Sequence, residues 1–199
     1  MCKKIGIIDY GSGNTQSIIN AFEYLNTKIC LIKPNQMDTV DALVLPGVGS
    51  FKNIAEKLRP YQKNILEYLE KNKPFLGICV GLQYLFEESF ENGKTQGLGF
   101  FEGKVKKLPS EKIPQIGWNT LEIKKPNQLL KGLSDGFFVY YVNSYAVDAR
   151  NCLASSFYKK SFAAVVGQGN VFATQFHPEK SGKNGLKILK NFIKVVKKC

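Results

Sequence analysis

The sequence predicts an α/β fold with a central, mostly parallel sheet, flanking helices and additional antiparallel strands in its second half. Two observations carry this prediction. In the first half, short apolar runs alternate with helical patterns, which indicates a parallel sheet covered by helices. Through residues 99–176, strand patterns instead follow one another, separated by Gly, Pro, Asn and Asp.

The expected strands of the first half are short apolar runs. They cover residues 4–9, 28–32, 42–45 and 75–79. Apolar residues at helical spacing predict helices over 15–26 and 53–71, with Pro60 as the candidate break in the second helix. A turn is expected over residues 11–14, and a third helix is expected after Cys79, running through Phe86.

The second half is expected to be rich in strands and to end in a helix. The strands are expected over residues 99–107, 113–123, 137–147, 152–158, 162–166 and 171–176. In the last segment Leu186, Leu189, Ile193 and Val196 form one apolar stripe, while lysines fill the opposite face. We find no internal repeat and no linker, so we expect one domain over residues 1–199.

Composition excludes several classes of protein. The chain has 199 residues, of which 44% are hydrophobic and 22% charged, values typical of a globular protein. No apolar run approaches the roughly 20 residues of a membrane span, and the N-terminus has no signal-peptide pattern. We therefore expect a cytoplasmic protein without a membrane partner. One histidine, and five cysteines without Cys-x-x-Cys spacing, predict neither a metal site nor a disulfide framework.

The net charge of +12 raises the question of nucleic-acid binding. Arg59 and Arg150 are the only arginines, and the lysines are scattered along the chain. Readers of bases and phosphates rely on the bidentate fork of arginine. We therefore expect no nucleic-acid partner, and binding that falls steeply with salt would be the sign of one.

The segment Gly77-Ile78-Cys79-Val80-Gly81 is the most specific motif. It follows an expected strand and opens an expected helix, as in the nucleophile elbow Gly-x-nucleophile-x-Gly. Such a tight turn strains the nucleophile and needs small neighbours, and the helix N-terminus favours a thiolate. The amide of Val80 would point at a developing oxyanion. The alternative is a buried structural cysteine between two packing glycines.

His177-Pro178-Glu179 supplies a candidate base. Pro178 favours an extended His177, and residues two apart in an extended segment point to one side, so Glu179 would orient the imidazole. Because His177 is the only histidine, it is the only imidazole available to activate Cys79. The alternative is a surface histidine at the end of a strand.

A third motif, Pro46-Gly47-Val48-Gly49-Ser50-Phe51, also follows an expected strand. In a parallel sheet it would lie at the same edge as Cys79, where such folds place their sites. Its glycines allow close approach of the backbone to a substrate, and Val48 is placed to donate a second oxyanion amide. The alternative is a plain turn.

Together these motifs resemble triad-type (class I) glutamine amidotransferases, and within them the glutaminase subunits of imidazole glycerol phosphate synthases. The resemblance covers essentially the whole chain. Beyond the elbow and Gln175-Phe176-His177-Pro178-Glu179-Lys180, it rests on residues 9–14, on 46–51, on Gly117-Trp118-Asn119 and on Ser144-Tyr145.

The resemblance implies a glutaminase with a Cys79, His177 and Glu179 triad and with Val48 and Val80 at the oxyanion hole. It implies no cofactor and no metal. Its partner is a (β/α)8-barrel cyclase, which uses the released ammonia to form imidazole glycerol phosphate in histidine biosynthesis. The remaining site residues fall into two groups. Those expected to bind glutamine are Gly47, Gly49, Gln83, Ser144 and Tyr145, and those expected at the partner interface are Asn14, Trp118 and Lys180.

Two residues depart from the family pattern. Gln115 and Asn143 stand where the family usually has histidine, near the glutamine pocket or the interface. They leave open a second interpretation, a paralogous glutaminase that supplies ammonia for amidination of a surface sugar. A cysteine peptidase-like hydrolase and an inactive interaction module are the rivals from other classes. The other four cysteines are expected to have no function.

Overall fold

Four apolar runs form the parallel centre of the sheet because both faces of such strands are covered. The computed structural model describes residues 3–11 and 14–199. The four strands, all of whose residues are buried, are β1 (Ile5–Ile8), β3 (Ala42–Leu45), β4 (Phe75–Ile78) and β14 (Val171–Thr174). Their order is β1-β3-β4-β14, and each pairs with its neighbour in parallel.

The same sheet is extended on both sides. Beyond β1 lies the parallel edge strand β2 (Ile29–Ile32). Beyond β14 lie three antiparallel strands, in the order β13 (Lys160–Gln168), β12 (Cys152–Tyr158) and β9 (Glu122–Ile123). This mixed sheet with helices on both faces confirms the predicted fold class.

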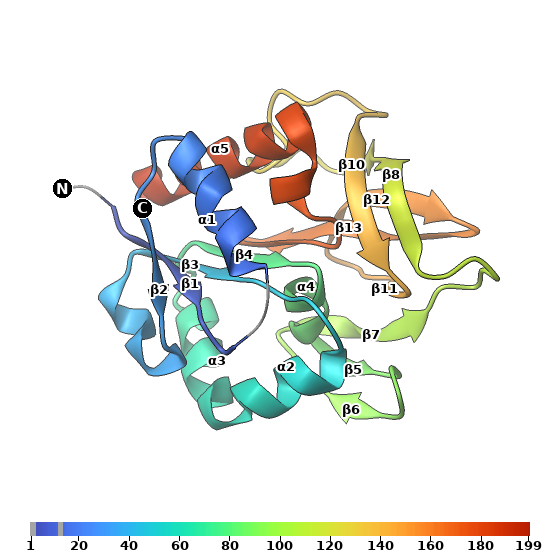
Figure 1. The fold of residues 1–199 in the computed structure, drawn as a ribbon, viewed down its shortest axis with the longest axis horizontal. Helices are drawn as coiled ribbons and strands as arrows, with labels where there is room; N and C mark the ends of the chain where they lie inside the picture. The colour runs from blue at the N-terminus through green and yellow to red at the C-terminus, as the bar shows by residue number, and fades with distance from the viewer. Residues whose placement is uncertain (1–2, 12–13) are drawn as a thin grey trace.

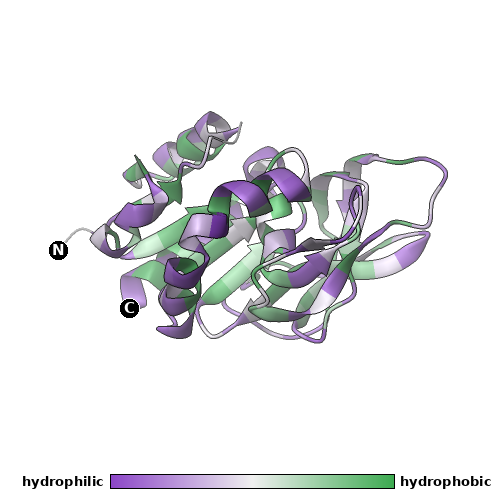
Figure 2. Ribbon diagram, turned by 90° about the horizontal axis from the view of Figure 1, so that it is seen from below, coloured by the Kyte–Doolittle hydropathy of each residue, from purple (hydrophilic) through white to green (hydrophobic). Residues whose placement is uncertain are grey.

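The helices cover the two faces of the parallel part (Figure 1). On one face lie α1 (Thr15–Tyr24) and α5 (Gly182–Lys198). On the other lie α2 (Phe51–Leu58), α3 (Gln62–Glu70) and the short α4 (Val80–Tyr84). Figure 2 shows the apolar strands in green between helices that are largely purple on the outside, as burial of apolar surface requires.

Two smaller sheets stand at one end of the main sheet. One pairs β8 (Gln115–Thr120) with β10 (Phe138–Asn143). The other has the order β11-β7-β5-β6, with its strands at Tyr145–Val147, Phe101–Lys107, Phe86–Ser89 and Thr95–Gln96. Three 3-10 turns complete the described chain: η1 (Pro34–Thr39), η2 (Arg59–Tyr61) and η3 (Pro178–Lys180).

Most of the predicted elements are confirmed, including the break at Pro60, which lies in η2 between α2 and α3. The predicted end of the third helix is wrong. Phe86 belongs to β5, because α4 stops at Tyr84 and the chain then pairs with β7. The runs 113–123 and 137–147 each divide into two strands that belong to different sheets.

The turn expected over residues 11–14 includes Ser12 and Gly13, which lie outside the described residues, as do Met1 and Cys2. Of the helices in the described part of the chain, none is both long and apolar enough to cross a membrane.

The predicted stripe of α5 gives a test of packing. Leu189 is fully buried, whereas Leu186 is only partly buried against the core. We expect Leu189→Ala to lower the free energy of unfolding by about 2–5 kcal/mol, since it removes core contacts and leaves a cavity. Leu186→Ala is the matched control and should cost clearly less. Equal losses in urea denaturation would contradict the observed orientation of α5.

Candidate active site

Cys79 occupies a strained turn between β4 and α4. Its φ of 55° and ψ of −110° lie in a region that residues with a side chain rarely adopt. Its backbone N–H donates to the carbonyl of Thr174 at 2.7 Å, and its side chain is buried. This is the geometry predicted for a nucleophile elbow.

Close contacts explain the glycines around the elbow. A Cβ on Gly81 would lie 2.3 Å from the Leu45 carbonyl oxygen, and one on Gly77 would lie 2.9 Å from the Gly81 carbonyl oxygen. A Cβ on Gly47 would lie 2.2 Å from the Gly81 nitrogen. The end of β3 therefore packs backbone against backbone on the start of α4.

His177 reaches the elbow because β14 pairs in parallel with β4. Its Nδ1 lies 2.8 Å from Oε1 of Glu179, and both side chains are almost fully buried. The predicted contact is confirmed, but its predicted reason is not. His177 is extended, whereas Glu179 lies in the 3-10 turn η3, so this turn brings the carboxylate back to the ring.

The surroundings of His177 raise the pKa of its imidazole from 6.5 to about 10. Burial alone would lower this pKa, but hydrogen bonds to Cys79 and to Glu179 outweigh it. Because Glu179 engages Nδ1, Nε2 is the nitrogen left to face the sulfur. The three side chains are thus placed as a nucleophile, a base and an orienting carboxylate need to be for nucleophilic catalysis.

Asn14 lies against the triad. Its side-chain amide donates to Oε1 of Glu179 at 2.7 Å, so this oxygen is held by both Asn14 and His177. Among the described residues, Oε2 of Glu179 has no hydrogen-bond partner. The family resemblance implied only a role at the partner interface for Asn14. No pattern in the sequence indicated its contact with Glu179, which lies 165 residues further along the chain.

A cavity of about 260 Å³ opens beside the sulfur. Four of the residues expected to bind substrate line it, namely Gly49, Gln83, Ser144 and Tyr145. Cys79 and Val80 line it as well, whereas neither Gly47 nor Val48 is among the described residues that do. Gly47 lies instead against the elbow backbone.

Gln115 and Asn143 face each other across the β8–β10 pair, and both are buried. The Asn143 amide donates to the Tyr145 carbonyl at 3.0 Å, and Asn143 also lines the cavity. Within the described residues, the side-chain oxygens of Gln115 and Asn143 lack partners. The two departures from the family pattern therefore lie together at the wall of the site.

Two residues at the site had no predicted role. Glu91 lines the cavity and accepts a 2.6 Å hydrogen bond from the Phe51 amide. Gln175 is fully buried, and its Nε2 lies 3.8 Å from the Cys79 sulfur. The signal for Gln175 was its position two residues before His177, which places both on one side of an extended segment. Glu91 lies in a turn, and no pattern in the residues around it indicated a place at the site.

Trp118 and Lys180 lie at the surface, Lys180 as the last residue of η3 and Trp118 next to that turn. Trp118 is 55% exposed, and its ring packs edge-on against Tyr140. A Cβ on Gly182 would lie 3.9 Å from the Trp118 ring, so Trp118 borders the turn that carries Glu179 and Lys180. Lys180 itself is exposed.

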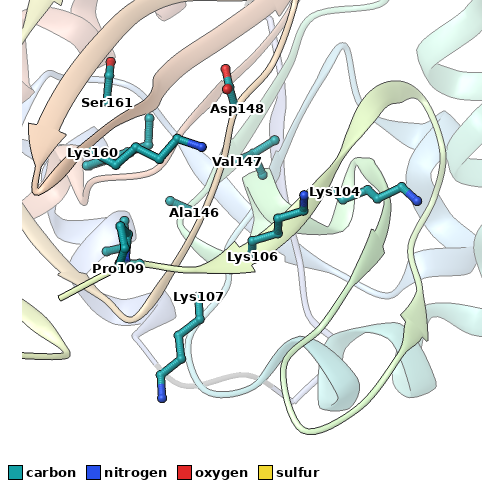
Figure 3. A pocket seen from close by; sticks show the side chains of 11 residues that line it. Lys104, Lys106, Lys107, Pro109, Ala146, Val147, Asp148, Lys160 and Ser161 are labelled. Carbon is teal, nitrogen blue, oxygen red and sulfur yellow. The ribbon is translucent and has the colours of Figure 1, made fainter. Parts of the chain in front are cut away.

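A second cavity, of about 330 Å³, lies between β7, β11 and β13. Four lysines line it, namely Lys104, Lys106, Lys107 and Lys160. Figure 3 shows that the Lys104 and Lys107 ammonium groups point away from one another, and Lys104 is paired with Glu88 at 2.7 Å. Lys104 and Lys107 are thus not placed to bind one common anion. Across residues 3–11 and 14–199, no three His, Cys, Asp or Glu side chains form a group that could hold a metal ion.

Comparisons with known proteins identify the family of this chain. The sequence profile of the class-I glutamine amidotransferases matches residues 6–196. The chain is similar to the "Imidazole glycerol phosphate synthase subunit HisH" of Caldanaerobacter subterraneus subsp. tengcongensis, with 46% identity over 97% of this chain and 98% of that protein. The protein of the same name from Methanosarcina mazei is 45% identical over 97% and 99%.

Solved structures show the same fold. A crystal structure of a glutamine amidotransferase matches with a TM-score of 0.74 and 21% identity, over 97% of this chain and 98% of that one. The structure of PurLQS from Thermotoga maritima matches with a TM-score of 0.75 and 18% identity, over 98% and 99%.

The close backbone contact at the elbow can be tested through the stability of the protein. We expect Gly81→Ala to cost more than about 2 kcal/mol of unfolding free energy, because the new methyl group would overlap the Leu45 carbonyl. Gly136→Ala is the control, since its φ is +79° but no atom lies within 4 Å, so it should lose only about 1 kcal/mol. Chemical denaturation measures both, and similar losses would disprove the close approach.

The single histidine allows a direct pH measurement. We expect the imidazole C–H resonance to titrate near pH 10 in the wild type and at lower pH in Glu179→Gln, which removes the carboxylate. A raised pKa stabilises the fold fully below pH 6.5, and this contribution is lost as pH rises through about 10. The excess stability of the wild type over Glu179→Gln should shrink across that window.

Glu102→Gln is the control for this titration because Glu102 pairs with Arg150 at the surface. A wild-type midpoint at or below the ordinary histidine value would contradict the buried hydrogen bonds described here.

Proposed function

Since the chain belongs to the class-I glutamine amidotransferases, we propose that it hydrolyses L-glutamine to L-glutamate and delivers the ammonia to a cyclase subunit in histidine biosynthesis. The similarity to HisH subunits over nearly the whole chain supports this assignment. The observation that carries the chemistry is the buried Cys79, His177 and Glu179 arrangement beside a small cavity. We propose that residues 1–199 form one glutaminase domain and act in the cytoplasm, without a cofactor.

The reaction follows from the roles of the three side chains. His177 holds the proton taken from the Cys79 thiol, in line with its raised pKa, and the Cys79 sulfur adds to the side-chain amide carbon of glutamine. His177 then gives the proton to the amide nitrogen and the C–N bond breaks. Ammonia departs, and a thioester remains on Cys79. A water molecule gives its proton to His177 and attacks the thioester, and cleavage of the C–S bond releases glutamate. Glu179 keeps the ring in the tautomer that these transfers need.

Backbone amides are proposed to hold the oxyanion. Val80 is the first residue of α4 and lines the cavity, so its N–H belongs to the unpaired donors of a helix start. Val48 is proposed as the second donor. Its loop carries Gly49, whose φ of +89° marks a backbone conformation open to few other residues.

The cavity suits an amino acid. Its volume of about 260 Å³ lies just below the ~300–1,000 Å³ of pockets for larger ligands. We propose that Gly49, Gln83, Ser144 and Tyr145 contact glutamine there. Gly47 serves this pocket indirectly, because it permits the packing of the elbow.

An exposed apolar face supports partner binding. Four side chains of β8 and β10 are at least 36% exposed, namely Ile116, Trp118, Phe138 and Val142. An exposed cluster of this kind is typical of an interface. We propose that a (β/α)8-barrel cyclase covers this face, with Trp118, Lys180 and Asn14 at its border. Nucleic acids and membranes are not part of the proposal.

The sugar-amidinating alternative is not favoured, because the similar curated proteins are subunits of imidazole glycerol phosphate synthase. Gln115 and Asn143 remain its only support. They are buried side by side and leave the Cys79, His177 and Glu179 contacts in place.

Glutamate release tests the proposal. With the cyclase of the same genome and its ribonucleotide ligand, release should rise by orders of magnitude over the isolated chain. Cys79→Ala should lower it by roughly 10⁴-fold or more, as expected when a nucleophile is removed. Cys152→Ala is the control, because Cys152 is a free cysteine outside the cavity residues. Glutamate release that depends on Cys79 but does not change when the cyclase is added would contradict the histidine-pathway role.

A further inference from the structure

A chain of buried amides connects the substrate cavity to the nucleophile. The Nε2 of Gln83 lies 3.0 Å from the Tyr145 carbonyl oxygen and 3.0 Å from Oε1 of Gln175. The Nε2 of Gln175 in turn lies 3.8 Å from the Cys79 sulfur. Gln83 is 3% exposed and Gln175 is not exposed at all, so water does not replace these contacts.

The backbone carbonyl of Tyr145 fixes the direction of this chain. A carbonyl oxygen only accepts hydrogen bonds, so the NH2 end of Gln83 must face it. The two hydrogens of that NH2 group then donate to the Tyr145 carbonyl oxygen and to the side chain of Gln175. Gln175 must therefore turn its side-chain oxygen toward Gln83. The NH2 end of Gln175 is therefore the end that faces the sulfur.

This orientation favours the charged form of the nucleophile. A thiol can donate to the Val142 carbonyl oxygen, which lies 3.8 Å from the sulfur, but a thiolate would be repelled by that oxygen. The amide of Gln175 offsets the repulsion, because a donor hydrogen bonds more strongly to an anion than to a neutral atom. Its full burial strengthens the effect.

We propose that Gln175 is a catalytic residue that donates a hydrogen bond to the Cys79 thiolate, with its orientation set by Gln83 and the Tyr145 carbonyl. The proposal deepens the glutaminase function and rests on it for its meaning. Gln83 then has two roles, since its nitrogen orients Gln175 and the residue also lines the substrate cavity.

Alkylation of Cys79 by iodoacetamide tests this without glutamine or a partner. The rate is followed on the full chain by peptide mass spectrometry, which separates Cys79 from the other cysteines. For Gln175→Leu we expect labelling to be roughly 3- to 10-fold slower than wild type near neutral pH, since the thiolate loses a donor. Above about pH 10, where thiols ionise anyway, the two rates should converge.

Two further variants distinguish charge from packing. Gln175→Glu keeps the shape but places a carboxylate near the sulfur, so it should label more slowly than Gln175→Leu near neutral pH. Thr174→Val is the matched control, because Thr174 is the equally buried neighbour of Gln175 at the end of β14 and its hydroxyl donates to the Phe176 carbonyl instead. Thr174→Val should label like the wild type.

Wild-type labelling of a folded Gln175→Leu, or slowing by the same factor at every pH, would overturn the proposal. If circular dichroism shows that Gln175→Leu is unfolded, Gln83→Met carries the test, because it leaves Gln175 in place but removes its orienting donor. Slower labelling near neutral pH is then expected, and unchanged labelling overturns the proposal. Normal labelling behaviour in a chain that never releases glutamate would instead count against the glutaminase function alone.

Discussion

The backbone contact between the end of β3 and the start of α4 is the constraint on which the site depends. Gly81 lies so close to the Leu45 carbonyl that no side chain fits, and Gly47 approaches the Gly81 nitrogen from the other side. This packing pins the turn after β4 and holds Cys79 at a φ of 55°. A strained residue of this kind persists only when its surroundings fix it, and here the strain turns the sulfur toward the cavity.

The parallel pairing of β4 with β14 converts that local constraint into a catalytic arrangement. Thr174 is aligned with Ile78, so the residues that follow each strand emerge side by side at one edge of the sheet. His177 and Gln175 thus approach the same sulfur from a neighbouring strand. Burial would by itself favour a neutral ring, and hydrogen bonds to Cys79 and to the carboxylate of Glu179, which Asn14 also holds, reverse that preference.

The sequence was informative where a local pattern has one structural solution. Gly-x-Cys-x-Gly after an apolar run predicted the elbow, and the alternation of strands and helices predicted the parallel sheet. The strand β5 was missed because Phe86-Glu87-Glu88-Ser89 is half acidic, and Glu88 is tolerated there only through pairing with Lys94 and Lys104. The contact of Asn14 with Glu179 and the contact of Gln83 with Gln175 each join residues that are 92 or more positions apart in the sequence. The periodicity of a sequence cannot reveal such contacts.

The proposed reaction depends on Cys79 acting as the nucleophile that forms a covalent bond to glutamine. The most direct measurement is covalent trapping with the diazoketone analogue of glutamine, followed by peptide mass spectrometry of the full chain. One adduct is expected, on the peptide that contains Cys79, and it should form more slowly when glutamine competes. An adduct on another cysteine, or labelling of Cys79 that glutamine does not slow, would contradict the assignment of this cavity as the site of glutamine hydrolysis.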